Sequence, residues 1–226
     1  MKCKIVINSN TRFSSFTLPP LLKSLKSAGF RKSEIIIMIG GYSSRGESIT
    51  RPKRFKLPFD AIDFTSFIEL SERDIQSDYC FVMHDTSKVG KNFKEIISSV
   101  EPRDLDVISL RKLPSMNIGL YRTAFIQQKY SDLTKLKNSD YTEEGMHAMK
   151  VWGVENEDFL SWGQDDISIS SYADLLSDPR NGIPIVLGEY DYYTNNVKRR
   201  IEYYEYLDFY KVKANWNRKE KYELGL

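Results

Sequence analysis

Residues 4–39, KIVINSNTRFSSFTLPPLLKSLKSAGFRKSEIIIMI, decide the fold of this chain. Lys4 to Ile7 is a short, mainly apolar run that stops at Asn8-Ser9-Asn10, which is the pattern of a buried strand ending in a polar loop. Ile35 to Ile39 is a continuous and mostly β-branched run, which is typical of a parallel strand covered on both faces.

The segment between these two strands has helical spacing. Its apolar residues are Leu18, Leu21, Leu22, Leu25 and Ala28. We expect Thr17 to cap this helix, Pro19 and Pro20 to fit its first turn, and Gly29 to end it. The start of the chain therefore predicts a β-α-β unit.

The rest of the chain repeats the strand-loop-helix order less regularly. Expected strands are Ala61–Phe64, Tyr79–Met83, Asp106–Leu110, Asn117–Tyr121 and Ile183–Leu187. Expected helices are Phe67–Ile75, a segment with Phe93, Ile96, Ile97 and Val100 on one face, Thr123–Tyr130, Glu143–Val151, Asn156–Leu160 and Ile167–Leu176. Tyr42 to Pro58 is interpreted as a long surface loop, and Lys198 to Lys213 as a helix that enters a strand. These patterns predict an α/β fold with an open, mostly parallel central sheet and helices on both faces.

Composition narrows the function classes. The chain has 226 residues, 41% of them hydrophobic, and a net charge of +2, which is too balanced for a general nucleic-acid binder. No run approaches the ~20 apolar residues of a membrane span, and the N-terminus lacks a signal-peptide core, so we expect a cytoplasmic protein. Cys3 and Cys80 are interpreted as buried thiols, and two histidines are too few to favour a zinc site.

Three polar segments follow expected strands, at the positions where open α/β sheets bind ligands. They are Asn8-Ser9-Asn10-Thr11-Arg12, Gly40-Gly41-Tyr42 and His84-Asp85-Thr86-Ser87. Hydroxyl, amide and guanidinium groups there suit the sugar and phosphates of a nucleotide. Candidate contacts are therefore Asn8, Ser9, Asn10, Arg12, Gly41, His84 and Asp85. The absence of GxGxxG, GxxxxGK[ST] and GxSxG disfavours Rossmann oxidoreductases, P-loop nucleotidases and α/β hydrolases.

The order of these features resembles the nucleotide-sugar-dependent glycosyltransferases of the GT-A fold over nearly the whole chain. In that family a central strand ends in a DxD-type element that holds Mn²⁺ or Mg²⁺ against the donor diphosphate. Asp85 in FVMHDTSKVG stands at the last aspartate of that element, and Met83 replaces the first. The resemblance implies a cation at Asp85, whose shell the donor phosphates and waters would complete. An acid at a strand end can also cap the turn that follows it.

The second element of the resemblance is WGVENED at 152–158, which is similar to the WGxxxED stretch of some inverting GT-A enzymes. In those enzymes the aspartate after the glutamate takes the proton from the acceptor hydroxyl, which implies Asp158 as the catalytic base. Glu157 and Glu155 are alternatives, because several acids in one turn offer a carboxylate to the same oxygen. Acids at this place also stabilise the start of a helix through its dipole.

Three further residues are candidate contacts. Asn117 and Tyr121, in SMNIGLYR, could face the acceptor, although alternation along a strand explains them equally well. Arg199, in a basic group of three residues, could reach the donor diphosphate or lie on a solvated face.

The sequence therefore predicts one domain over 1–226, with a nucleotide-sugar-binding half at about 1–110 and an acceptor-binding half at about 111–226. Its predicted activity is a hexosyltransferase type of glycosyl transfer, inverting and metal-assisted, from a nucleotide sugar to a carbohydrate or other hydroxyl acceptor. Two alternatives stay open, namely a sugar-1-phosphate nucleotidyltransferase and a catalytically silent carbohydrate-binding or scaffolding relative.

Overall fold

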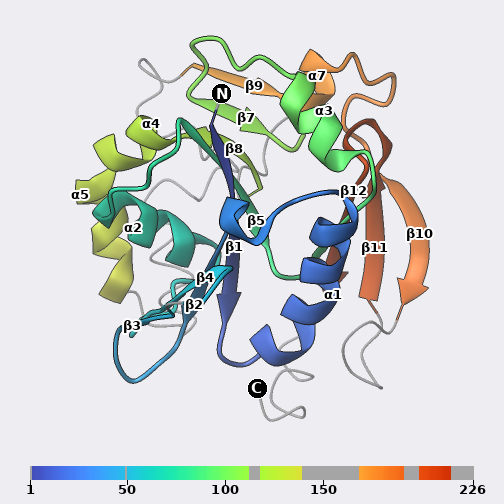
Figure 1. Ribbon diagram of the computed structural model, residues 1–226. Helices are drawn as coiled ribbons and strands as arrows, with labels where there is room; N and C mark the ends of the chain where they lie inside the picture. The colour runs from blue at the N-terminus through green and yellow to red at the C-terminus, as the bar shows by residue number, and fades with distance from the viewer. Residues whose placement is uncertain (1, 49, 112–117, 139–167, 191–198, 215–226) are drawn as a thin grey trace.

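The structure, a computed structural model, describes residues 2–48, 50–111, 118–138, 168–190 and 199–214. At its centre is an eight-stranded sheet in the order β3-β4-β2-β1-β5-β8-β7-β9 (Figure 1). Its strands are β1 (Cys3–Asn10), β2 (Ile35–Gly40), β3 (Gly46–Glu47), β4 (Lys53–Lys56), β5 (Tyr79–His84), β7 (Val107–Ser109), β8 (Gly119–Arg122) and β9 (Ile169–Ser171). Strands β4, β2, β1 and β5 are parallel to one another, and β8 is antiparallel to both of its neighbours.

Helices cover both faces of this sheet (Figure 1). On one face lie α1 (Ser14–Ser27) and α3 (Phe93–Ser99), and on the other lie α2 (Thr65–Glu72), α4 (Thr123–Gln128) and α5 (Tyr130–Lys135). The alternation of side chains along β1 explains the two cores, since Ile5 and Ile7 join the α1 side and Val6 joins the α2 side. The expected mostly parallel α/β fold with helices on both faces is confirmed.

Short helical elements complete the described architecture. They are η1 (Lys32–Glu34), η2 (Ile62–Phe64), η3 (Leu136–Asn138), α7 (Tyr172–Leu175) and η6 (Glu205–Leu207).

A second, four-stranded antiparallel sheet packs beside α1 and α3 (Figure 1). It consists of β10 (Ile185–Tyr190), β11 (Arg199–Tyr204), β12 (Phe209–Ala214) and β6 (Ser87–Val89). Phe209 joins this sheet to the main core, with its ring centroid 5.8 Å from that of Phe93. The junction depends on Gly90, because a Cβ there would lie 1.9 Å from Asp208 Oδ1.

Four sequence expectations for local structure are wrong. Residues 42–58 contain the paired strands β3 and β4, because Phe55 on β4 is fully buried and lies under the guanidinium of Arg73 at 4.0 Å. Residues 198–213 hold two antiparallel strands joined by η6, not a helix that enters a strand. Instead of the expected strand at 61–64, residues 62–64 form η2, and the expected helix at 167–176 divides into β9 and α7.

The expected start of α1 is also wrong. The helix begins at Ser14, which places Pro19 and Pro20 inside it, and Thr17 is not its cap. The chain can begin the helix earlier because the amides of Phe16 and Thr17 both bond to the Phe13 carbonyl, at 2.9 and 3.0 Å. Thr17 is buried instead of capping the helix, and its hydroxyl bonds to Asp85.

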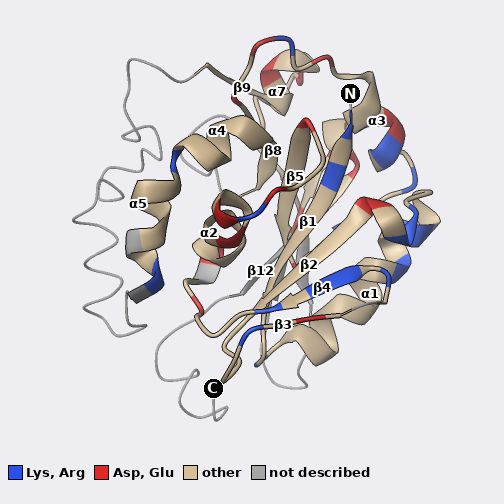
Figure 2. Ribbon diagram, turned by 60° about the vertical axis from the view of Figure 1, so that its left-hand side comes forward, with Lys and Arg blue, Asp and Glu red and all other residues tan. Residues whose placement is uncertain are grey.

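A buried ionic cluster fastens α2 to the edge of the sheet. Glu69 is fully buried, and its Oε1 accepts from Arg73 Nε at 2.5 Å and from Arg45 Nη1 at 3.2 Å. Arg45 also donates to Glu72 at 2.7 Å. Figure 2 shows acidic positions on α2 and basic positions along β4. These bonds tie α2 to the loop before β3, at the end of the sheet order where β3 and β4 lie.

Candidate functional site

The ends of the parallel strands bring the three polar segments of the sequence together. In the register of the sheet, Asn8 on β1 lies beside His84 on β5, and Asn10 lies beside Gly40 at the end of β2. The amide of Thr11 then bonds to the Gly40 carbonyl at 2.9 Å, which ties the first segment to the second. We call this end of β2, β1 and β5 the carboxyl edge.

On the α1 side of the carboxyl edge, Asp85 is held by two hydroxyls. Ser9 Oγ lies 2.5 Å and Thr17 Oγ1 lies 2.6 Å from Asp85 Oδ2, and Asp85 is only 7% exposed. Its backbone amide donates to the Asn8 carbonyl at 3.0 Å. Burial raises the pKa of the Asp85 carboxyl, and the hydrogen bonds from Ser9 and Thr17 offset part of that rise. Sequence reasoning missed Thr17, although its spacing from Leu21 places it on the buried helix face.

Asp85 as it stands does not fit a bound divalent cation. Mn²⁺ and Mg²⁺ need a carboxylate oxygen open to the ion, to waters and to phosphates, whereas Asp85 Oδ2 already accepts from two hydroxyls and the residue is only 7% exposed. Among the described ranges, no cluster of three or more His, Cys, Asp or Glu side chains could hold a metal ion. The metal at Asp85 stays a prediction.

On the α2 side of the same edge, His84 faces Asp63 of η2. His84 Nδ1 lies 3.4 Å from Asp63 Oδ1, which favours a proton on Nδ1 and leaves Nε2 as the acceptor. Nε2 is buried and has no hydrogen-bond partner in the part of the chain that the structure describes. A ligand that donates a hydrogen bond would satisfy this nitrogen. No pattern in the sequence pointed to Asp63, because it meets His84 only through the tertiary fold.

The two asparagines of β1 organise the backbone around them. Asn8 Oδ1 accepts from the Ser66 amide at 2.9 Å, in the first turn of α2, where helix amides lack partners. Asn10 Oδ1 accepts from the amides of Arg12 and Phe13 at 3.1 and 3.2 Å, which turns the chain into α1. Arg12 is left exposed beside this turn.

Glycine is required where the second segment leaves β2. A Cβ on Gly40 would lie 2.7 Å from the Phe59 carbonyl oxygen, and Gly41 has a φ of +87°. Gly40 therefore lets the backbone of Phe59 and Asp60 pack against the end of β2, and Gly41 supplies a backbone conformation that other residues rarely adopt.

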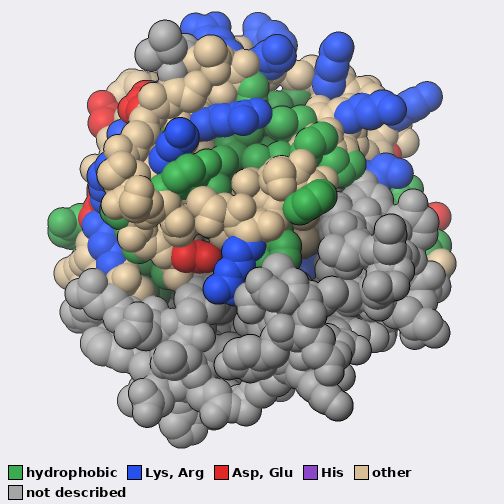
Figure 3. Space-filling view, turned by 90° about the horizontal axis from the view of Figure 1, so that it is seen from below, with side chains coloured by type: hydrophobic (Ala, Val, Ile, Leu, Met, Phe, Trp, Pro, Cys, Tyr) green, Lys and Arg blue, Asp and Glu red, His purple; other side chains and the backbone are tan. Residues whose placement is uncertain are grey.

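The carboxyl edge combines an apolar surface with positive charge. Figure 3 views the molecule from the side toward which β1 runs, and there hydrophobic side chains gather with Lys and Arg side chains around them. One apolar group in this part of the fold is Phe16 in the first turn of α1, which is 60% exposed. Such a surface suits a ligand that carries both phosphate and a planar or sugar ring.

The structure does not bring every predicted site residue to this edge. Tyr121 is fully buried, with its ring centroid 4.7 Å from that of Phe67 on α2, and burial raises its pKa. Its side chain therefore belongs to the core instead of facing an acceptor. The Arg199 backbone begins β11 in the second sheet. The predicted residues Asn117, Glu155, Glu157 and Asp158 lie outside the described residues, as do the predicted helices at 143–151 and 156–160.

A cavity of about 770 Å³ in the described structure lies away from the carboxyl edge. It is lined by the end of α3, residues 100–105, β9 and α7. Tyr79 at the start of β5 hydrogen-bonds to the backbone of Arg103 and Leu105, so this cavity lies near the opposite end of the sheet. We place the candidate site at the carboxyl edge, because that is where unpaired buried polar atoms and strand-end glycines meet.

Burial of Asp85 predicts a measurable pH dependence of stability. Between the ordinary pKa of 3.8 and its raised value in the folded chain, the folded state holds more protons at this group than the unfolded state. The free energy of unfolding therefore falls as pH rises through that window. Asp85→Asn lacks the titrating group, so we expect its Tm relative to wild type to increase from about pH 4 to about pH 7. A Tm difference that stays flat over this range, measured by circular dichroism, would contradict the raised pKa.

Comparisons with known proteins give likeness at the level of the fold. No protein family profile and no curated protein matches the chain. Among solved structures, residues 1–349 of TarS from Staphylococcus aureus match at 13% identity and a TM-score of 0.41, over 65% of this chain and 54% of TarS. The glycosyltransferase GlyE from Streptococcus pneumoniae TIGR4 matches at 10% identity and a TM-score of 0.45, over 79% of this chain and 47% of GlyE.

A third match is the 4-diphosphocytidyl-2C-methyl-D-erythritol synthase from Anaerococcus prevotii DSM 20548, at 11% identity and a TM-score of 0.41. It covers 74% of this chain and 86% of that protein. Glycosyltransferases are thus among the solved structures that this chain is similar to, and the chain spans about half of the TarS and GlyE chains. No residue role is taken from these matches. No helix within the described ranges is long and apolar enough to cross a membrane.

Proposed function

We propose that this chain is a glycosyltransferase that moves a sugar from a nucleotide-sugar donor to a carbohydrate or other hydroxyl acceptor. The observation that supports the proposal is the meeting of three polar segments at the carboxyl edge, where open α/β sheets bind ligands. The buried and unpartnered His84 Nε2 at that edge is the kind of atom that a bound ligand satisfies.

The described residues have distinct roles in this proposal. His84, oriented by Asp63, accepts a hydrogen bond from the donor. The exposed Arg12 offers a guanidinium to the donor phosphates, and Gly41 gives the loop after β2 the positive φ that shapes this edge. Asp85 does not contact the donor itself. It holds Ser9, and with it the end of β1 against which the donor binds.

The proposed reaction is a direct displacement. The acceptor oxygen forms a bond to the anomeric carbon while the bond from that carbon to the diphosphate breaks, which inverts the configuration. Asp158 takes the acceptor proton, and Glu157 or Glu155 is the alternative base. Because Asp85 does not fit a cation in the described arrangement, we derive no step through a metal ion. The predicted requirement for Mn²⁺ or Mg²⁺ is tested by running the donor assay with each ion and with chelator.

The test is donor binding and turnover across UDP-, GDP- and TDP-sugars, with Mn²⁺, with Mg²⁺ and with chelator. We expect one donor to release its nucleoside diphosphate, and His84→Ala to weaken the binding of that donor by about tenfold, as the loss of one hydrogen bond predicts. Lys32→Ala is the matched control, because Lys32 is exposed in η1 before β2, at the other end of the strand.

The other outcomes separate the alternatives. Pyrophosphate release from a nucleoside triphosphate would indicate a nucleotidyltransferase. Glycan binding without donor turnover would indicate a silent binding module. A folded protein that neither binds nor turns over any donor would overturn the proposal.

A further inference from the structure

The outer face of α1 combines positive charge with an exposed aromatic ring. Helical spacing places four exposed residues opposite the buried face of this helix, and they are Phe16, Pro19, Lys23 and Lys26. Phe16 is 60% exposed, and Arg12 is exposed just before the helix begins. A large apolar ring that is open to solvent beside cations is typical of a surface that docks on something else.

Acidic residues are missing from this part of the sequence. Residues 11–33 contain five Lys or Arg residues and no Asp or Glu, and residues 48–59 contain four Lys or Arg residues and no Asp or Glu. Because the net charge of the whole chain is only +2, the remaining residues carry a net negative charge. The positive charge of this protein is therefore gathered in two segments instead of being spread evenly.

The fold brings the two segments to the same side of the main sheet. On β4, Arg54 and Lys56 lie beside Ile37 and Ile39 of β2, and both isoleucines belong to the core that α1 covers. Partnered residues of neighbouring strands point to the same face, so Arg54 and Lys56 project on the α1 side, where both are exposed.

We call the surface formed by Arg12, Phe16, Lys23, Lys26, Arg54 and Lys56 the basic face. The acids next to it in the sequence, Glu34 and Glu47, are already paired with other cations. Lys and Arg side chains surround hydrophobic ones on the side of the molecule where α1 begins (Figure 3). The charge of the basic face is therefore available to an anionic partner.

We propose that the basic face docks on the surface of an anionic lipid bilayer, with α1 lying along the membrane. The lysines and arginines attract acidic headgroups, and Phe16 enters the headgroup layer and leaves water. A soluble polyanion would engage the cations alone, whereas a bilayer also takes the apolar ring. Docking in this way places the carboxyl edge beside the membrane, because Arg12 and Phe16 follow the end of β1. The inference does not depend on the proposed activity.

The test is co-sedimentation of the full chain with vesicles of phosphatidylcholine, with and without about 30% phosphatidylglycerol. We expect the anionic vesicles to bind the protein at least about tenfold more tightly than the neutral ones at about 0.1 M KCl, and this preference to shrink at about 0.5 M KCl. Heparin is the soluble polyanion used for comparison. Equal binding to the two kinds of vesicle, or no binding to either, would overturn the proposal.

Two variants separate the cations from the aromatic ring. Lys23→Gln combined with Lys26→Gln should weaken binding to the anionic vesicles at least about tenfold at low salt and less at high salt. Phe16→Ser should weaken that binding at both salt concentrations, because the contribution of a buried ring is not screened by ions. All three side chains are exposed, so Tm should stay that of wild type.

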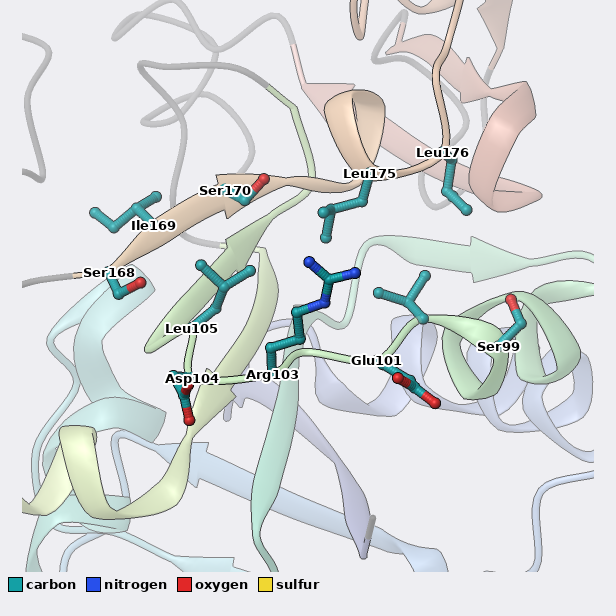
Figure 4. Close-up of a pocket in the computed structure, with 11 residues that line it drawn as sticks. Ser99, Glu101, Arg103, Asp104, Leu105, Ser168, Ile169, Ser170, Leu175 and Leu176 are labelled. Atoms are coloured by element: carbon teal, nitrogen blue, oxygen red, sulfur yellow. The ribbon is translucent and has the colours of Figure 1, made fainter.

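The matched control removes the same charge from the other end of the sheet. Arg103 and Arg180 are exposed, and Arg103 lies near Glu101 and Asp104 in the depression beside α7 (Figure 4). Arg103→Gln combined with Arg180→Gln should bind anionic vesicles as wild type does.

Two further outcomes would contradict docking through the basic face. If the Arg103 and Arg180 variant loses as much binding as the Lys23 and Lys26 variant, net charge drives the association instead of this surface. If Phe16→Ser retains full binding while heparin binds tightly, the surface recognises a soluble polyanion and not a bilayer.

Discussion

Replacing Asp85 with alanine is expected to lower the free energy of unfolding by about 1–3 kcal/mol, although this residue lies at a strand end. The reason is that Ser9 and Thr17 are buried and both hydroxyls bond to the one carboxylate oxygen. Alanine removes the acceptor of Ser9, whereas Thr17 can still donate to the Phe13 carbonyl at 3.0 Å. A buried hydroxyl without a partner costs about 1–3 kcal/mol. Urea denaturation of wild type and Asp85→Ala measures this loss.

Asp85→Asn is the matched control for this prediction. The asparagine carbonyl oxygen can still accept from Ser9 and Thr17, so its loss of stability should be under half that of Asp85→Ala. Equal losses in the two variants would show that the charge, not the acceptor oxygen, holds the strand end. Because Asp85→Asn is expected to fold, it also allows the metal requirement of the donor reaction to be compared with wild type.

Replacing Glu69 with alanine is expected to cost about 3 kcal/mol of unfolding free energy. Glu69 is fully buried and receives hydrogen bonds from Arg45 and Arg73, so its removal leaves two guanidinium groups beside a new cavity. The estimate is at the low end for a broken buried ion pair because both arginines are partly exposed and can be hydrated.

Two further variants show whether burial causes that effect. Glu69→Gln keeps the volume and one acceptor oxygen, so it should cost less than Glu69→Ala. Glu72→Ala removes an acid of the same cluster that is 15% exposed and bonds to Arg45 and Lys137, and it should cost about 1 kcal/mol or less. If Glu72→Ala is as damaging as Glu69→Ala in thermal and urea unfolding, the cluster acts through net charge instead of burial.

Strand and helix periods made the core of the fold predictable. The apolar runs at 5–7, 35–39 and 79–83 could only satisfy their backbone and bury both faces as central parallel strands, and they form β1, β2 and β5. The same logic placed polar segments after these strands at one edge. It failed at β3, β4 and β11, because these strands carry charged or aromatic residues whose pairing depends on distant partners.

The sequence by itself therefore determined the central sheet and the place where its polar loops meet, since both follow from local periodicity and strand direction. Only the tertiary structure decided what those loop residues do. It turned Asp85 inward to Ser9 and Thr17, brought Asp63 to His84 and buried Tyr121 against Phe67. These contacts join residues far apart in the chain, and their geometry is set by how helices pack on the sheet, which no local pattern records.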